Sequence, residues 1–139
     1  MTKPNLFCYS TVREFGGYSL PVPIQNQLLK TYCEKNNFIY KLSIVESYIK
    51  DNYMYLNNLI DSVSEQANIG MCSIYMFPKE IEKFKALEAS ICKKELVLHF
   101  LFENCKISFN DLNSFYLNSR LRFLHNEEES IEEIIRIME

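Results

Sequence analysis

The sequence predicts one α/β domain in which a four-stranded, mainly parallel sheet is covered by helices on both faces. Four short apolar runs alternate with segments of helical periodicity along residues 1–105, and this alternation is typical of a parallel sheet with crossover helices. The 139 residues are 47% hydrophobic and 14% aromatic, which is enough to build one core. We therefore predict an α/β core domain over 1–105 and a C-terminal helical extension over 106–139, packed on the core or on a partner subunit.

Each predicted strand is a short apolar run that ends at a turn signal. The runs cover residues 6–9, 38–45, 71–77 and 96–102. Ser10 and Thr11 follow the first run, and Pro78 closes the third. Right-handed crossovers favour the flavodoxin-like order 2-1-3-4, in which the second strand lies outside the first.

The first predicted helix begins near Pro23, which suits a first helical turn because its missing N–H needs no acceptor there. Its apolar face is formed by Ile24, Leu28, Leu29 and Tyr32. Gln25 and Asn26 lie in the first turn, beside backbone donors and the positive end of the helix dipole. This helix start is therefore a predicted place to hold an anion.

Further amphipathic segments follow the second and third strands and fill the extension. Their apolar faces are Leu56, Leu59, Ile60 and Val63, and then Ile81, Phe84, Leu87 and Ile91. Ser108 and Asp111 resemble a capping box that opens a helix in the extension. The tail predicts a final helix whose apolar face consists of Ile131, Ile134, Ile135 and Met138.

The charge distribution argues against nucleic acid as a partner. Residues 127–139 hold six glutamates and one arginine, so this segment has a net charge of -5 and the rest of the chain about +2. No basic stripe is present, and an acidic tail would resist nucleic acid. Because no apolar run reaches the roughly 18 residues of a membrane helix and no signal-peptide core begins the chain, we expect a cytoplasmic protein without membrane insertion.

Cysteine and histidine usage predicts neither a metal site nor a cofactor. The cysteines stand singly at wide intervals, without metal-ligand spacing, which favours reduced and buried thiols. They are Cys8, Cys33, Cys72, Cys92 and Cys105. His99 lies inside an apolar run, so we interpret it as a hydrogen-bonded core histidine rather than a catalytic one.

Polar residues gather where the predicted strands end. The carboxyl ends of parallel strands meet at the crevice where the strand order reverses. The predicted catalytic residues are Glu46 and Glu103, which end the second and fourth strands and could move a proton. The predicted substrate-binding residues are Ser10, Arg13, Gln25, Asn26, Tyr53, Asn57, Ser73 and Tyr75. Among these, Arg13 would grip a phosphate or carboxylate with its forked donors.

Several of these residues have structural alternatives. Arg13 fits equally well as a solvated loop residue, and Ser10 fits a turn hydroxyl better than a nucleophile. Ser73 and Tyr75, two apart in a predicted strand, share a face and could simply pack the core. The tyrosines that either stack on a sugar ring or roof the sheet are Tyr48, Tyr53 and Tyr55.

Five blocks between residues 6 and 105 carry a family resemblance. They are Pro21-Val22-Pro23-Ile24-Gln25-Asn26 with Tyr32-Cys33, Leu42-Ser43 with Glu46, Tyr53-Met54-Tyr55-Leu56, Ser73-Ile74-Tyr75-Met76-Phe77-Pro78, and Leu98-His99-Phe100 with Glu103. This pattern resembles the sporadic carbohydrate-cluster proteins, small proteins encoded among bacterial surface-polysaccharide and O-antigen genes. The proline and Gln-Asn block is its strongest part, and Arg13 falls where the family has an arginine. The chain departs from the family at Val22-Pro23 and after Glu103, which leaves the tail unassigned.

A fainter similarity is to the catalytic domain of serine recombinases. It consists of the layout of Tyr9-Ser10-Thr11 ahead of a glutamine-containing helix, and of the run Cys72-Ser73-Ile74-Tyr75. In that family an Asp-Arg pair and further arginines follow the third strand. Here the place reads Met76-Phe77-Pro78-Lys79, so a shared, resolvase-like sheet order explains the similarity better than strand transfer does.

The family resemblance implies a place in surface-polysaccharide biosynthesis, and two functions fit it. The first is an enzyme that acts on a phosphorylated or nucleotide-activated sugar, as an isomerase, lyase or transferase with a carboxylate acid or base. The second is a non-catalytic binding or assembly protein that recognises a sugar nucleotide and forms a homo-oligomer. A degenerate serine-recombinase-like domain is a distant third.

Overall fold

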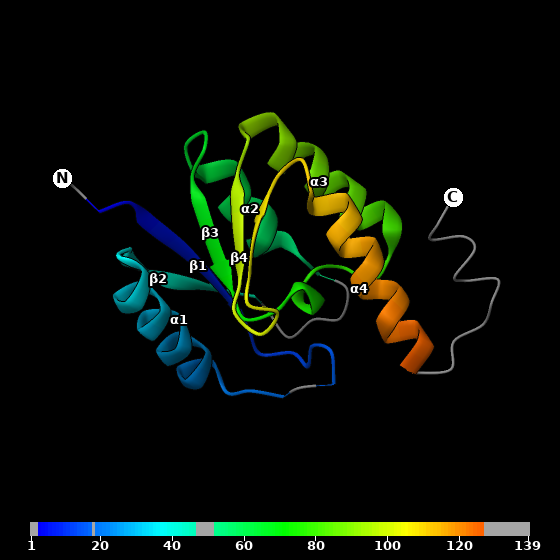
Figure 1. Ribbon diagram of the computed structural model, residues 1–139, viewed down its shortest axis with the longest axis horizontal. Coiled ribbons are helices and arrows are strands. Elements are labelled where there is room, and N and C mark those ends of the chain that lie inside the picture. The colour runs from blue at the N-terminus through cyan, green and yellow to red at the C-terminus, as the bar shows by residue number, and fades with distance from the viewer. Residues whose placement is uncertain (1–2, 18, 47–51, 127–139) are drawn as a thin grey trace.

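The computed structural model describes residues 3–17, 19–46 and 52–126. The strands are β1 (Asn5–Thr11), β2 (Ile39–Glu46), β3 (Asn68–Met71), β4 (Val97–Phe100) and β5 (Cys105–Ser108). The helices are α1 (Val22–Asn36), α2 (Met54–Ser62), the short 3-10 helix η1 (Ile74–Met76), α3 (Ile81–Lys94) and α4 (Leu112–Asn126) (Figure 1). Tyr48 and the helix predicted over the acidic tail lie outside the described residues.

The strands form one sheet in the order β2-β1-β3-β4-β5. The first four are parallel, which confirms the predicted α/β class and the order 2-1-3-4 for these strands. The prediction of four strands was wrong, because β5 adds an antiparallel edge next to β4. The chain reverses between them in a tight turn, where Asn104 adopts a left-handed conformation (φ 53°) and donates its N–H to the Leu101 carbonyl at 3.1 Å.

The third strand is shorter than predicted. It ends at Met71, and the predicted strand residues 74–76 form η1 instead. The Ser73 hydroxyl accepts the Tyr75 N–H at 3.1 Å, and the Glu103 carboxylate accepts the Ile74 N–H at 2.8 Å. These side chains take backbone donors that a continuing strand would have used, so Ser73 and Tyr75 lie in a turn rather than on one face of a strand.

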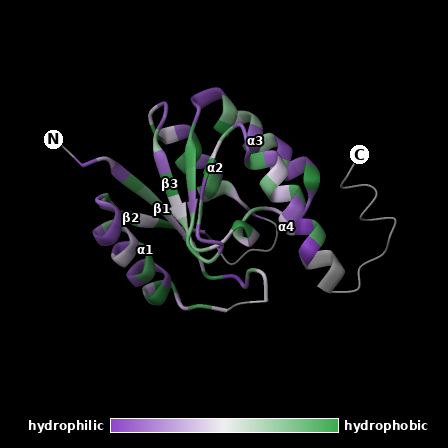
Figure 2. Cartoon of the chain, viewed as in Figure 1, coloured by the Kyte–Doolittle hydropathy of each residue, from purple (hydrophilic) through white to green (hydrophobic). Residues whose placement is uncertain are grey.

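The two faces of the sheet are covered unequally. α1 packs on one face, where its Leu29 and Cys33 meet Leu6 and Cys8 of β1. The other face carries the larger core, to which α2, α3 and α4 contribute (Figure 1). Along the helices purple and green alternate in Figure 2, as expected for amphipathic helices that bury one side. Because β1 to β4 are parallel, their carboxyl ends lie at the same edge of the sheet.

His99 is a core residue, as predicted. Its side chain is 1% exposed and lies between the Tyr32 hydroxyl, 2.6 Å from Nδ1, and the Asn68 Oδ1, 2.9 Å from Nε2. A carbonyl oxygen only accepts, so Nε2 carries the proton and Nδ1 accepts from Tyr32. Burial and the nearby Lys106 lower the pKa of His99 to about 4, so the ring is neutral at pH 7.

The cysteines are free thiols in different environments. Cys8, Cys33 and Cys72 are buried as predicted, whereas Cys92 is exposed on α3 and Cys105 is half-buried. Burial raises the pKa of the Cys72 thiol to about 12, with a further contribution from the nearby Glu103. The buried thiols therefore act as small apolar side chains. No helix in the described part of the chain is long and apolar enough to cross a membrane.

Hydrogen bonds from the Lys94 side chain connect α3 to the C-terminal end of α2. Its ammonium group donates to the carbonyls of Ile60 at 2.9 Å and Val63 at 2.8 Å, and also to that of Asp61. These carbonyls lie at the C-terminal end of α2, where acceptors lack intrahelical partners and a positive charge is favourable.

Lys94→Met should lower the free energy of unfolding by about 1–2 kcal/mol, because the last carbonyls of α2 lose a charged donor. Urea unfolding followed by circular dichroism measures the change. Lys93→Met is the matched control, since Lys93 is exposed one residue earlier on the same helix. Equal stability of the two variants would show that the Lys94 contacts contribute nothing.

Candidate functional site

Glu46 ends β2 and its carboxylate holds neighbouring elements together. The side chain is 1% exposed and accepts the Tyr9 hydroxyl at 3.0 Å. It also accepts the backbone N–H groups of Tyr55 at 3.2 Å and Leu56 at 3.1 Å. These N–H groups lie in the first turn of α2, whose N-cap residue Tyr53 makes no side-chain cap. Glu46 therefore caps α2 from β2. Burial raises the pKa of Tyr9, and the charge of Glu46 and its hydrogen bond raise it further.

Glu103 follows β4 and plays a similar part at η1. Its carboxylate accepts the Ser73 hydroxyl at 2.8 Å and the Ile74 N–H at 2.8 Å. The Glu103 side chain is half-buried, whereas Ser73 is fully buried. Burial raises the pKa of Glu103, and the hydrogen bonds from Ile74 and Ser73 oppose that rise. The carboxyl group is thus nearer to protonation than an ordinary glutamate, which suits proton transfer.

Gln25 joins α1 to the end of β1. Its amide nitrogen donates to the carbonyls of Thr11 at 2.6 Å and Leu20 at 2.8 Å, while its amide oxygen accepts the Thr11 N–H at 3.1 Å. Next to it, the Ser10 hydroxyl donates to the Asn26 side chain at 3.0 Å. The polar groups of Gln25 are therefore used within the protein, and the side chain is 0% exposed.

The start of α1 offers few donors to an anion. Pro23 has no N–H, and the N–H groups of Ile24 and Gln25 both donate to the Pro21 carbonyl, at 3.0 and 3.1 Å. Three successive residues at this helix start therefore offer no backbone N–H group to the anion that we predicted there. Sequence reasoning placed the helix correctly, but it could not show where its first donors point.

Arg13 and Tyr53 meet at the carboxyl edge of the sheet. The Arg13 guanidinium lies over the Tyr53 ring, 4.4 Å from its centroid, in a cation–π arrangement. Arg13 Nε also donates to the Thr11 hydroxyl at 3.4 Å. Both side chains are half-buried, so together they form a positively charged, aromatic surface beside β1. Asn57 is exposed, and its side chain donates to the Tyr53 carbonyl at 2.9 Å.

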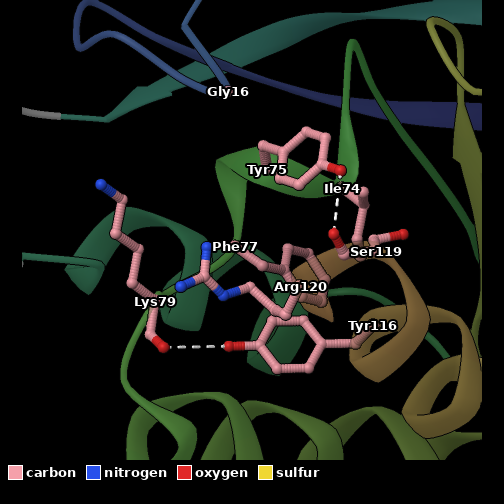
Figure 3. A pocket seen from close by; sticks show the side chains of 8 residues that line it. All are labelled: Gly16, Ile74, Tyr75, Phe77, Lys79, Tyr116, Ser119 and Arg120. Atoms are coloured by element: carbon pink, nitrogen blue, oxygen red, sulfur yellow. Dashed lines mark hydrogen bonds between the residues drawn. The ribbon is translucent and has the colours of Figure 1, made fainter. Parts of the chain in front are cut away.

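A small pocket lies between η1, the segment after it, and α4. It is lined by Gly16, Ile74, Tyr75, Phe77, Lys79, Tyr116, Ser119 and Arg120 (Figure 3). The Tyr75 hydroxyl donates to the Ser119 carbonyl at 3.0 Å, and the Tyr116 hydroxyl donates to the Pro78 carbonyl at 2.6 Å. Burial raises the pKa of Tyr116 to about 12. Both phenols are therefore neutral donors that fix the walls of the pocket.

The structure divides the predicted site into two groups. Glu46, Gln25, Ser10 and Asn26 form internal hydrogen bonds that hold β1, β2, α1 and α2 together. Arg13, Tyr53 and Glu103 are half-buried, and Tyr75 lines the pocket. Ser73 is buried, and its hydroxyl group is bonded to Glu103. The sequence prediction missed the pocket residues Lys79, Tyr116 and Arg120, because α4 was assigned to an extension and its polar residues were not combined with those of the sheet. The two arginines of α4, Arg120 and Arg122, were the available signal.

Among the described residues, no three side chains of histidine, cysteine, aspartate or glutamate gather where they could hold a metal ion. No protein-family model matches this chain, and no curated protein matches it.

Proposed function

We propose that this protein recognises a phosphorylated or nucleotide-activated sugar at the carboxyl edge of its sheet, as a binding protein of bacterial surface-polysaccharide biosynthesis. The observation that carries the proposal is the Arg13 guanidinium stacked on Tyr53, 4.4 Å from the ring centroid. Arginine suits phosphate, and an aromatic ring suits the face of a sugar or base. We propose a sugar as the ligand because the sequence resembles the sporadic carbohydrate-cluster proteins.

The position of this pair in the fold supports binding. β1 has β2 on one side and β3 on the other, and β2 and β3 follow it in sequence. The strand order therefore reverses between β1 and β3. In open α/β sheets, ligands bind at such a point, outside the carboxyl ends of the strands. Arg13 follows the end of β1, and Tyr53 directly precedes α2.

The hydrogen bonds of Glu46 argue against a catalytic role for this residue. They therefore favour a binding protein over an enzyme that uses Glu46. A proton-transferring carboxylate must reach the substrate. The Glu46 oxygens instead accept the Tyr9 hydroxyl and the first N–H groups of α2, and the side chain is 1% exposed. We therefore assign Glu46 a structural role.

A second candidate function, an enzyme acting on the same class of sugar, is favoured by Glu103. Burial raises the pKa of its carboxyl group, and the residue is half-buried rather than enclosed. It contacts Ile74, which lines the pocket. Glu103 would donate a proton to a sugar bound at the carboxyl edge of the sheet, or accept a proton from it.

Titration calorimetry with a panel of nucleotide sugars and sugar phosphates tests the proposed function. We expect binding that Arg13→Gln weakens about tenfold, since a charge-assisted hydrogen bond contributes roughly 1.5–3 kcal/mol. Lys30→Gln is the control, because Lys30 is an exposed cation on α1. Absence of binding across the panel, or equal affinity of the two variants, would overturn the proposal.

Product analysis by chromatography separates the two candidates. A binding protein returns every bound sugar unchanged. Turnover that disappears in Glu103→Gln, while the affinity for the sugar stays, would establish the enzyme instead.

A further inference from the structure

We propose that β2 is the contact surface of a homodimer, in which the β2 strands of two copies pair antiparallel and join both sheets into one. β2 lies at the edge of the sheet, with β1 on one side and no strand of the described residues on the other. An edge strand presents a row of backbone N–H and C=O groups to which another strand can bond. This surface is separate from the Arg13–Tyr53 pair and does not depend on the sugar.

Exposed apolar side chains gather on β2. Among the described residues, ten large apolar side chains are exposed, and four of them belong to this strand. They are Ile39 (39% exposed), Leu42 (77%), Ile44 (39%) and Val45 (37%). Lys41 is the one exposed charged residue of β2, because Glu46 is buried. A contiguous apolar surface of this kind is typical of a contact with another protein.

The opposite edge of the sheet is built differently. β5 has four residues, and the exposed one among them is Lys106. Short strands and lysines are features by which proteins keep a sheet edge from pairing. β2 has eight residues, about 26 Å of strand, and lies at the end of the sheet away from α4 (Figure 1). One edge is thus protected, whereas the other is long and apolar.

A bulge in β2 determines how two copies pair. Phe7 of β1 pairs with Lys41, and Tyr9 pairs with Ile44, so residues 42–43 of β2 stand opposite one residue of β1. Such a bulge interrupts the regular ladder of hydrogen bonds. A regular strand would not match β2 along its whole length, but a second β2 does when the two bulges lie opposite each other.

The two faces of β2 are symmetric about this bulge. Successive side chains of β1 point to opposite faces of the sheet, and each β2 residue points to the same face as its β1 partner. One face holds Ile39, Lys41, Ile44 and Glu46, and the other holds Tyr40 and Val45. A two-fold axis through the bulge places Lys41 of one copy opposite Ile44 of the other, and in the same way Tyr40 meets Val45. Both pairs share a face, as cross-strand neighbours must, so β2 is self-complementary and a second copy of this chain is the partner that fits.

The size of the contact predicts a weak dimer. The Leu42 side chains of both copies meet near the axis and leave water together. A standard interface buries roughly 800 Å² from each partner, and a single pair of strands buries less. The Lys41 side chains of both copies lie on the same face and repel each other, which weakens the dimer further. We therefore expect a dissociation constant of about 100 μM.

Sedimentation equilibrium of the full chain, from about 10 μM to about 1 mM, tests the dimer. We expect mostly monomer at the lowest concentration and mostly dimer at the highest. Leu42→Lys should weaken the dimer about tenfold or more, because a second like charge from each copy enters the contact. Ile24→Lys is the matched control, since Ile24 is an exposed apolar residue of α1 (47%), and it should leave the dimer unchanged. Both side chains are exposed, so neither substitution removes a core contact.

Hydrogen exchange over the same concentrations identifies the contact as strand pairing. The β2 amides that point away from β1 should exchange fast in the monomer and become protected as the dimer forms. A monomer at every concentration, or equal dimerisation of Leu42→Lys and Ile24→Lys, would overturn the proposal. Protection of these amides at every concentration would also overturn it, because a segment of the same chain would then cover the edge. A dimer that forms while no nucleotide sugar binds would sustain this inference and count against the proposed function alone.

Discussion

Glu46→Ala should lower the free energy of unfolding by about 4 kcal/mol. Removing the carboxylate leaves the Tyr9 hydroxyl and the N–H groups of Tyr55 and Leu56 without this acceptor in a buried place. Each buried donor left unsatisfied costs roughly 1–3 kcal/mol, and the costs of neighbouring groups do not simply add. Urea unfolding at pH 7, followed by tyrosine fluorescence and circular dichroism, measures the loss.

Tyr9→Phe is the matched control for this prediction. It removes one donor and keeps the ring in the core, so we expect a loss of about 1 kcal/mol. In Glu46→Ala the same Tyr9→Phe change should cost less than in the wild type, because its partner is already gone. A stable Glu46→Ala variant that had lost sugar turnover would contradict the structural role and restore Glu46 as a catalytic residue.

The second large effect is an acid-dependent loss of stability caused by His99. The pKa of this ring is about 4 in the folded protein against 6.5 for an ordinary histidine. Between these values the unfolded chain binds the extra proton and the folded chain does not. The contribution of neutral His99 is therefore complete above pH 6.5 and is lost as the pH falls to about 4, by about 3 kcal/mol.

His99→Gln tests this pH dependence. Glutamine keeps a donor and an acceptor but does not titrate, so the variant should be less stable at pH 7 and its stability should change less between pH 6.5 and 4. Unfolding free energies from urea titrations at half-unit pH steps give both curves. If the two curves run parallel across this range, His99 is not the group responsible.

Most of the fold could be predicted because the patterns that indicate its strands and helices lie within short stretches of the sequence. Apolar runs and helical periodicity mark β1 to β4 and the helices, and right-handed crossovers then restrict the order of the strands. β5 was missed because Cys105–Ser108 is a four-residue strand of mixed polarity. η1 was missed because Glu103, 29 residues further along the chain, accepts the Ile74 N–H.

The candidate site was less predictable, because its contacts join residues far apart in the chain. Glu46 and Tyr9 are 37 residues apart, and their hydrogen bond depends on the register between β1 and β2. The pocket likewise combines Gly16, Lys79 and Arg120 from three separate segments. Residue types at strand ends indicated where polar groups would gather, but not which of them would bond to each other.

The carboxylate caps also bear on the order of events in folding. α2 has nine residues, its N-cap residue Tyr53 makes no side-chain cap, and its first turn has no acidic residue; isolated helices of this length are marginal in water. Its cap comes from β2, which must first pair with β1 for Glu46 to be in place. A peptide of residues 52–63 alone should therefore show little helicity, and α2 should form only after the β1–β2 pair.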